Sequence, residues 1–180
     1  MKNAQIDVPW LVRIKPGALA RLGLYLRRPC LTPVALFHSE GLLQSILEVA
    51  LQSLRDHGIA PALVHEVKEA SVEEAVQLLG AVPSSCRALV GVGGGKALDV
   101  AKYTAGLPGL LYFAVPTSLS NDGFCSPQAS LTLEGKRRSL PTGLPHAVVV
   151  DLAVCQRAPL MLWHSGVGDL SSKFTAVWDW

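Results

Sequence analysis

The stretch Gly91-Val-Gly-Gly-Gly-Lys-Ala-Leu-Asp99 decides the fold of this chain. The apolar run that leads into it, residues 86–92, is short and rich in β-forming residues, which predicts a buried parallel strand. After the glycines, residues 96–105 keep apolar side chains at helical spacing, which predicts a helix packed on a sheet. A strand, a glycine turn and a helix N-terminus let the backbone approach a phosphate and offer it free N–H groups. The stretch therefore predicts a phosphate-binding turn.

Two common nucleotide-binding motifs do not match this turn. A P-loop requires glycine at position 90 and serine or threonine at position 97, where the chain has Val90 and Ala97. The Rossmann fingerprint requires its third glycine where Lys96 stands. A tight strand-to-helix turn without a ligand therefore remains an alternative. The turn alone does not indicate which phosphate compound would bind.

Strands and helices alternate through the first 105 residues. Strands are expected at residues 8–14, 34–37, 62–65 and 88–92. Helices are expected at residues 17–28, 42–56, 71–80 and 96–105. The core-facing side of the second helix is expected to consist of Leu43, Ile46, Leu47, Ala50 and Leu54. This alternation predicts a parallel sheet covered by helices, so the fold class is α/β and Rossmann-like.

The pattern changes after residue 105. A strand over residues 110–115 is followed by a loop over residues 116–126, which carries more hydroxyl and amide side chains than a simple connection needs. Residues 128–140 predict a β-hairpin with its turn at Glu134-Gly135. A last strand over residues 147–150 ends at Asp151, and a helix is expected to begin at Leu170.

Composition limits the classes of function. The 180 residues are 49% hydrophobic and 17% charged, enough for a substantial core in one domain or a small pair. A net charge of +2 without an aromatic and basic patch argues against a nucleic-acid binder. No apolar run has the length of a membrane span, and no signal peptide is apparent. Four dispersed cysteines predict reduced thiols in a cytoplasmic protein.

Four blocks of sequence carry a family resemblance. They are GVGGGKALDVAKY, VPTSLSNDGFCSPQASL, LPHAVVVDLAVCQRAP and SGVGDLSSKFTAVWDW. Together they resemble the sn-glycerol-1-phosphate dehydrogenase family, in the superfamily of dehydroquinate synthase, glycerol dehydrogenase and iron-containing alcohol dehydrogenases. The resemblance implies a nucleotide-binding α/β domain over residues 1–163. Residues 164–180 would then begin a C-terminal helical metal and substrate domain whose remainder is missing from this sequence.

The same resemblance implies a reaction and a set of site residues. The reaction is the reduction of dihydroxyacetone phosphate by NADH or NADPH to sn-glycerol 1-phosphate, a glycerophospholipid precursor, assisted by a divalent metal, zinc or nickel. The residues carried over to the pyrophosphate are Gly94, Gly95, Lys96, Ala97 and Leu98. Those carried over to the rest of the nucleotide are Thr117, Ser118, Leu119, Ser120 and Ser126. Asp122 would contact the substrate, and Asp169 would bind both metal and substrate.

Simpler interpretations of these residues remain open. A Gly-Asp pair before a helix is commonly an N-cap, and Asp122-Gly123 is commonly a turn. Asp169 alone cannot complete a site of three protein ligands. His146 and His164 are expected nearer the cleft than the other histidines, although a structural role is favoured for each. Ser39 stands where relatives that prefer NAD often carry an acid, which predicts loose choice between NAD and NADP.

Three functions are consistent with the sequence. The first is the nucleotide-binding half of the dehydrogenase, working as a homo-oligomer on a small phosphorylated substrate. The second is a dehydroquinate synthase-type phosphate lyase, which forms a carbocycle and shows no net change in NADH. The third is a catalytically incomplete nucleotide-binding module, which binds cofactor without turnover.

Overall fold

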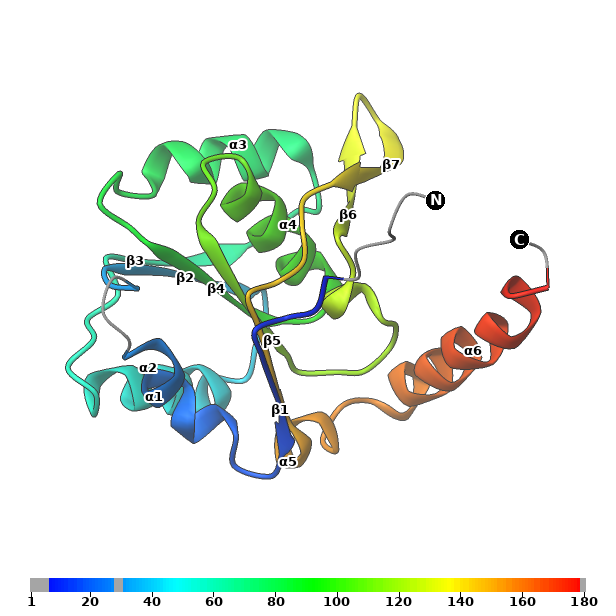
Figure 1. Cartoon of the computed structure of the whole chain (residues 1–180), viewed down its shortest axis with the longest axis horizontal. Helices are drawn as coiled ribbons and strands as arrows, with labels where there is room; N and C mark the ends of the chain where they lie inside the picture. Colours follow the sequence, from blue (N-terminus) through cyan, green and yellow to red (C-terminus); the bar gives the residue numbers. More distant parts are fainter. Residues whose placement is uncertain (1–6, 28–30, 179–180) are drawn as a thin grey trace.

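The computed structural model describes residues 7–27 and 31–178, and these residues form a six-stranded parallel sheet (Figure 1). Its strand order is β1-β8-β5-β4-β2-β3, and every neighbouring pair is parallel. The strands are β1 Leu11–Lys15, β2 Val34–Ser39, β3 Leu63–Val67, β4 Ala88–Gly93, β5 Leu111–Pro116 and β8 Ala147–Asp151. The predicted α/β class is confirmed.

Helices cover both faces of the sheet (Figure 1). One face carries the 3₁₀ helix η1 (Leu19–Arg21), α1 (Leu22–Leu26) and α2 (Gln44–Arg55); the other carries α3 (Val72–Ala81) and α4 (Gly95–Gly106). Side chains along a strand alternate between the two cores. In β4, Val90 and Val92 pack with the α1–α2 layer, whereas Leu89 packs with the α3–α4 layer.

Residues next to the helices determine where α2 ends and where α3 begins. Gly58 adopts φ +72° after α2 and donates its N–H to the Arg55 carbonyl, as glycine does at helix ends. The Ser71 hydroxyl accepts the Glu74 N–H and caps α3. The expectation that Leu43 faces the core is wrong: it is 53% exposed, because α2 begins only at Gln44.

The strand order reverses between β2 and β4. From β2 the chain passes through α2 to the outer strand β3, and then returns to place β4 on the other side of β2. The connections that leave the carboxyl ends of β2 and β4 therefore diverge to opposite faces of the sheet. In open α/β sheets such a point forms the crevice in which ligands bind.

A hairpin of β6 (Gln128–Leu133) and β7 (Lys136–Pro141) packs against α4 through Ala129 and Leu131. Its turn at Glu134-Gly135 has φ of 50° and 72°, the positive angles of a two-residue hairpin turn, so this prediction is confirmed. A short 3₁₀ helix, η2 (Gly123–Cys125), lies in the loop that precedes β6.

Helix α5 (Leu152–Cys155) follows β8, and α6 (Leu160–Ala176) then extends away from the sheet (Figure 1). The expectation that a helix begins at Leu170 is wrong, because α6 starts directly after Pro159 and runs through Gly166 and Gly168. None of the helices in the described part of the chain is long and apolar enough to cross a membrane.

Candidate functional site

The glycine turn follows β4 and packs against the carboxyl end of β2. Gly93 has φ +150°, and a Cβ at this position would lie 2.0 Å from the Ser39 hydroxyl oxygen. That hydroxyl accepts a hydrogen bond from the Gly94 N–H at 3.0 Å. The two strand ends can approach this closely only because position 93 lacks a side chain.

The N-terminus of α4 opens onto the crevice. Gly94 is its N-cap residue, no described side chain caps it, and a Cβ at Gly94 would meet nothing within 4 Å. The Leu98 N–H already donates to the Gly94 carbonyl at 3.1 Å, so the free N–H groups of the first turn precede it. The Ala97 and Leu98 side chains are buried, which leaves only their backbone to face a ligand. This helix end is open for an anion.

The Lys96 side chain reaches across the crevice to the segments that follow β2 and β3. Its Nζ donates to the Lys68 carbonyl at 2.6 Å and lies 3.4 Å from a carboxylate oxygen of Glu40. Ser39, the position expected to select the cofactor, is followed directly by an acidic residue, Glu40. Lys96 and Glu40 are both substantially exposed, so water screens the attraction between them.

Two cavities flank the start of α4. One, of about 270 Å³, lies against the α5–α6 connection and is lined by Ser39, Gly94, Thr117 and Ser118 among others. The other, of about 330 Å³, lies against the hairpin, and its lining includes Gly95, Lys96, Asp99, Asp122, Ser126 and Arg137. Together these cavities bring seven of the twelve predicted site residues to one region of the surface.

The remaining predicted residues lie close by. Ser120 and Leu98 border a small hollow at the start of α4. The Leu119 backbone lies against Gly166 of α6. A larger cavity, of about 620 Å³, lies between β3 and α3 and is lined by none of the predicted site residues.

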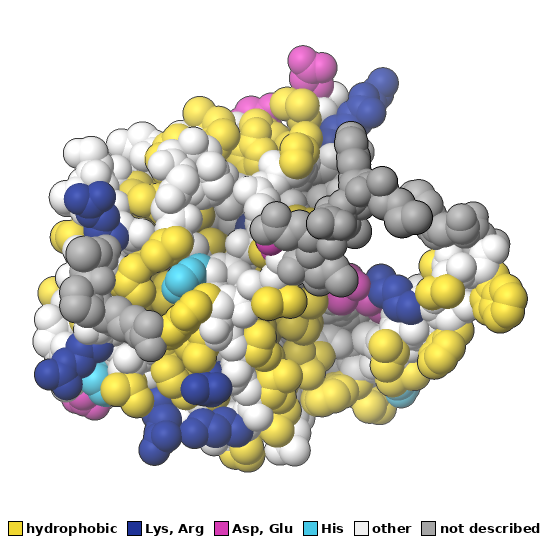
Figure 2. All heavy atoms as spheres, viewed as in Figure 1, with side chains coloured by type: hydrophobic (Ala, Val, Ile, Leu, Met, Phe, Trp, Pro, Cys, Tyr) yellow, Lys and Arg dark blue, Asp and Glu magenta, His cyan; other side chains and the backbone are white. Residues whose placement is uncertain are grey.

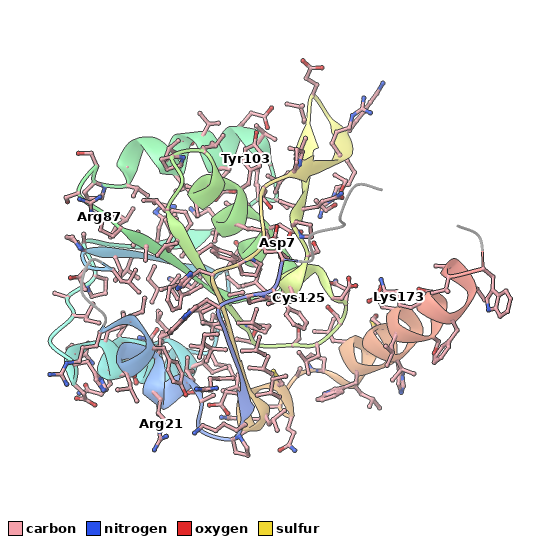
Figure 3. All side chains as sticks on the ribbon, in the orientation of Figure 1. Asp7, Arg21, Arg87, Tyr103, Cys125 and Lys173 are labelled. Atoms are coloured by element: carbon pink, nitrogen blue, oxygen red, sulfur yellow. The ribbon has the colours of Figure 1, made fainter. Side chains whose placement is uncertain are left out.

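The structure brings the two predicted acidic residues together from 47 positions apart. The Asp122 N–H donates to the Asp169 carboxylate at 3.1 Å. The Lys173 ammonium lies 3.0 Å from the Asp122 carboxylate and 3.7 Å from that of Asp169 (Figure 3). A hydrogen bond to Asp122 raises the pKa of Lys173. Lys173 therefore offsets the repulsion between the two carboxylates.

Gly166 allows this contact between helix and loop. A Cβ at Gly166 would lie 2.0 Å from the Leu119 carbonyl oxygen, so the backbones of α6 and the loop touch there. Asp169 and Lys173 follow Gly166 at helical spacing and therefore face the same loop. Asp169 lies within α6 rather than at its N-cap, which rules out the simpler N-cap interpretation.

Sequence reasoning missed the position of Lys102. This lysine is buried, and its ammonium is bonded to the Gly123 carbonyl in the loop over residues 116–126 and to the Gln128 carbonyl at the start of β6. The sequence signal was the pair Asp99 and Lys102, three residues apart on a helix, which indicates an ion pair but not the contacts with the two carbonyls.

A family model described as iron-containing alcohol dehydrogenase matches residues 13–159. The chain belongs to the iron-containing alcohol dehydrogenase family. The resemblance found in the sequence blocks is thereby confirmed.

Members of this family resemble the chain over nearly its whole length. It is 37% identical to the glycerol-1-phosphate dehydrogenase [NAD(P)+] of Thermofilum pendens, over 96% of this chain and 50% of the relative. The enzyme of the same name from Archaeoglobus fulgidus is 34% identical, over 100% of this chain and 51% of the relative. Glycerol dehydrogenase from Schizosaccharomyces pombe superposes with a TM-score of 0.80 at 25% identity, covering 97% of this chain and 45% of that structure. The chain spans about half the length of the curated relatives it matches.

The metal expected for this family does not fit the described residues alone. Within residues 7–27 and 31–178, no three His, Cys, Asp or Glu side chains gather as a metal site would require. The expectation that His146 lies near the cleft is wrong: it precedes β8 at the amino end of the sheet, stacked on Trp10 at 5.3 Å. His164 is exposed on α6. Asp169 remains a predicted metal ligand that would need partners.

Proposed function

We propose that this chain is the nucleotide-binding half of an NAD(P)-dependent glycerol-1-phosphate dehydrogenase, which reduces dihydroxyacetone phosphate to the lipid precursor sn-glycerol 1-phosphate. The observation that carries the proposal is the uncovered α4 N-terminus at Gly94, located where the strand order reverses. The names of the relatives from Thermofilum pendens and Archaeoglobus fulgidus support the cofactor and the substrate.

The cofactor would bind across the start of α4. The N–H groups of residues 95–97 would hold the pyrophosphate, and Lys96 would add a cation by leaving the Lys68 carbonyl. Thr117, Ser118, Leu119, Ser120 and Ser126 would line the rest of the nucleotide. When bound, the reduced nicotinamide supplies the hydride. Because the Glu40 side chain is exposed and its charge is screened by water, a 2′-phosphate would be only weakly opposed, which supports use of both NAD and NADP.

Substrate chemistry would take place at the contact between α6 and the loop. Asp122 lines the cavity beside the α4 N-terminus and is bonded to Asp169, and the two carboxylates would accept hydrogen bonds from the hydroxyl group of dihydroxyacetone phosphate. Hydride addition to the carbonyl carbon leaves an alkoxide, which must gain one proton. The zinc or nickel that the resemblance implies would stabilise that charge, but Asp169 would need ligands beyond those described here.

The division into domains belongs to the same proposal. Residues 1–163 would be the nucleotide-binding domain, and residues 164–180 the start of a helical domain that carries metal and substrate. Hydrophobic side chains gather along α6 (Figure 2), and the exposed ones include Val167, Leu170, Phe174, Val177 and Trp178. A further domain packed there would bury this surface.

We also propose that the protein acts in the cytoplasm and as a homo-oligomer. The three cysteines that the structure describes, Cys86, Cys125 and Cys155, are free thiols, which supports a reducing compartment; Cys30 lies outside the described residues. Exposed apolar side chains at alternate positions of the edge strand β1, including Val12 and Ile14, support self-association. Light scattering should then give a mass at least twice 19.2 kDa, and a monomer mass would contradict the oligomer.

The decisive test is Gly94→Ala, measured by binding of NADH and NADPH. Gly94 has φ −83° and open space at its Cβ, so alanine should fold normally yet stand where the pyrophosphate would lie. We expect about tenfold or greater loss of affinity at an unchanged unfolding temperature. Gly80→Ala is the matched control, because its Cβ also meets nothing within 4 Å and it lies far away on α3.

Equal affinity in Gly94→Ala and Gly80→Ala would contradict the proposal, as would wild-type protein that binds neither nucleotide. Turnover then separates the candidate functions. NADH oxidation with dihydroxyacetone phosphate and added zinc or nickel supports the dehydrogenase. Nucleotide binding without turnover supports the incomplete module, which the lack of a metal cluster among the described residues favours.

A further inference from the structure

The loop that carries Asp122 is tethered from below by one buried cation. The Lys102 side chain is 1% exposed, and its Nζ donates to the Gly123 and Gln128 carbonyls at 2.6 Å each. The third neighbour is an Asp99 carboxylate oxygen at the longer distance of 3.5 Å. These three acceptors match the three N–H donors of an ammonium group.

The distances show which contact dominates. Burying an ammonium group is costly unless all its donors are satisfied, and burial lowers the pKa of Lys102 while Asp99 opposes that shift. The two carbonyl contacts are short charge-assisted hydrogen bonds, whereas the ion pair is barely within hydrogen-bonding distance. The side chain therefore binds the loop more closely than it binds Asp99.

The two carbonyls lie directly after Asp122 and on either side of residues 124–127, which include Ser126. Gly123 directly follows Asp122, and Gln128 begins β6 two residues after Ser126. Asp122 and Ser126 both line the cavity beside α4. A cation that fixes residues 123 and 128 at once therefore sets the shape of the segment between them.

We propose that Lys102 is a positioning residue, which clamps the loop through its Gly123 and Gln128 carbonyls and so holds Asp122 and Ser126 against the nucleotide-binding turn. The consequence for cofactor binding rests on the proposed function, but the clamp itself does not. Lys102 would not touch the cofactor or the substrate.

Cys125 reports on this clamp directly. This residue lies within residues 124–127, and its thiol donates to the Asp122 carbonyl at 3.1 Å and is partly buried (Figure 3). Cys86 and Cys155 are buried in the core and serve as internal controls for global unfolding. Alkylation by iodoacetamide, resolved by peptide mass spectrometry on the full chain, gives a rate for each thiol.

Loss of the Lys102 charge alone would raise the pKa of the Cys125 thiol and slow its alkylation. We nevertheless expect Cys125 in Lys102→Met to be alkylated roughly tenfold faster or more, because the loop loses both charge-assisted bonds and exposes the thiol. The rates at Cys86 and Cys155 should not change. Lys15→Met removes a charge from β1 instead and should leave all three rates unchanged. An unchanged Cys125 rate in Lys102→Met would overturn the clamp.

A second variant separates the clamp from a simple ion pair. If Lys102 served only to neutralise Asp99, the double variant Lys102→Met/Asp99→Asn would restore the wild-type Cys125 rate, and the proposal would be wrong. If Lys102 clamps the loop, the rate stays high in the double variant. Should Lys102→Met fail to fold, Lys102→Arg keeps the charge but cannot place one atom between both carbonyls. Faster labelling of Cys125 alone in that variant supports the clamp, and the wild-type rate overturns it.

Measuring the affinity for NADH tests whether the clamp affects cofactor binding. With the loop released, we expect binding to weaken about fivefold at a temperature at which the Cys86 and Cys155 rates show that the variant is folded. If wild-type protein binds no NADH, the proposed function fails, but the labelling rates still decide the clamp. If wild-type protein binds NADH and the variant labels faster with unchanged affinity, the positioning role is overturned.

Discussion

A single methyl group should break the contact between α6 and the loop. In Gly166→Ala, the added Cβ would lie 2.0 Å from the Leu119 carbonyl oxygen and 3.1 Å from its carbon. Ordinary van der Waals contact begins at 3.4 Å, and both neighbouring atoms belong to the backbone. No side-chain rotation can relieve this overlap, so helix and loop must separate by more than about 1 Å.

That separation acts on a hydrogen bond nearby. The Asp122 N–H and the Asp169 carboxylate are 3.1 Å apart, and a shift of this size takes the pair out of bonding distance. A hydrogen bond of this kind contributes about 1 kcal/mol, so the Asp122 amide should exchange with deuterium roughly fivefold faster in Gly166→Ala. Amide exchange followed by NMR measures the rate for this residue.

Gly168→Ala is the matched control. It lies two residues along the same helix, and its Cβ would meet nothing within 4 Å. Both variants gain about 1 kcal/mol of helix propensity, so any difference between them comes from the contact at residue 166. Equal Asp122 exchange rates in the two variants would refute the close approach of α6 to the loop.

Three further predictions concern stability and can each be checked by urea unfolding. Gly93→Ala should cost about 2–3 kcal/mol, because its Cβ would overlap the Ser39 side chain at φ +150°; an unchanged midpoint would contradict this geometry. Asp151→Ala should cost about 3 kcal/mol, since this buried carboxylate accepts three backbone N–H groups, including that of Leu19 at 2.9 Å. Burial raises the pKa of the Cys155 thiol to about 11 from 9.0, so the folded protein holds this proton at higher pH than the unfolded chain does. The resulting stability is complete below pH 9 and is lost toward pH 11, by roughly 2–3 kcal/mol, and Cys155→Ala should lack this alkaline loss.

Most of the fold could be predicted because its signals are local. The hairpin turn at Glu134-Gly135, the Ser71 cap and the helix after the glycine turn each depend on a few adjacent residues. The start of α6 could not be predicted this way. Glycine is a poor helix former, so Gly166 and Gly168 suggested a break, but α6 runs unbroken through both positions. At Gly166, contact with the loop requires the very residue that weakens the helix signal.

The site was predictable in residue type but not in arrangement. Resemblance selected Asp122 and Asp169, whereas their contact depends on the path of α6 and on Lys173, which has no motif of its own. Lysine is rarely buried, and backbone carbonyls have no sequence signature, so the position of Lys102 beneath the loop could not be read from its neighbours. His146 was misplaced because its stacking partner, Trp10, is distant in sequence.

The pairing of β1 with β8 has a consequence for how this chain acquires its structure. Of the strands described here, β1 is synthesised before the others and lies beside β8, which is synthesised after them, and the Asp151 carboxylate binds the backbone of Leu19 across 132 residues of chain. Closing so long a loop costs entropy before any contact repays it, so we expect β1 to join the sheet late. In a nascent chain that ends before residue 147, β1 and β5 lack β8, the strand with which both pair. Unpaired strand edges of this kind promote aggregation.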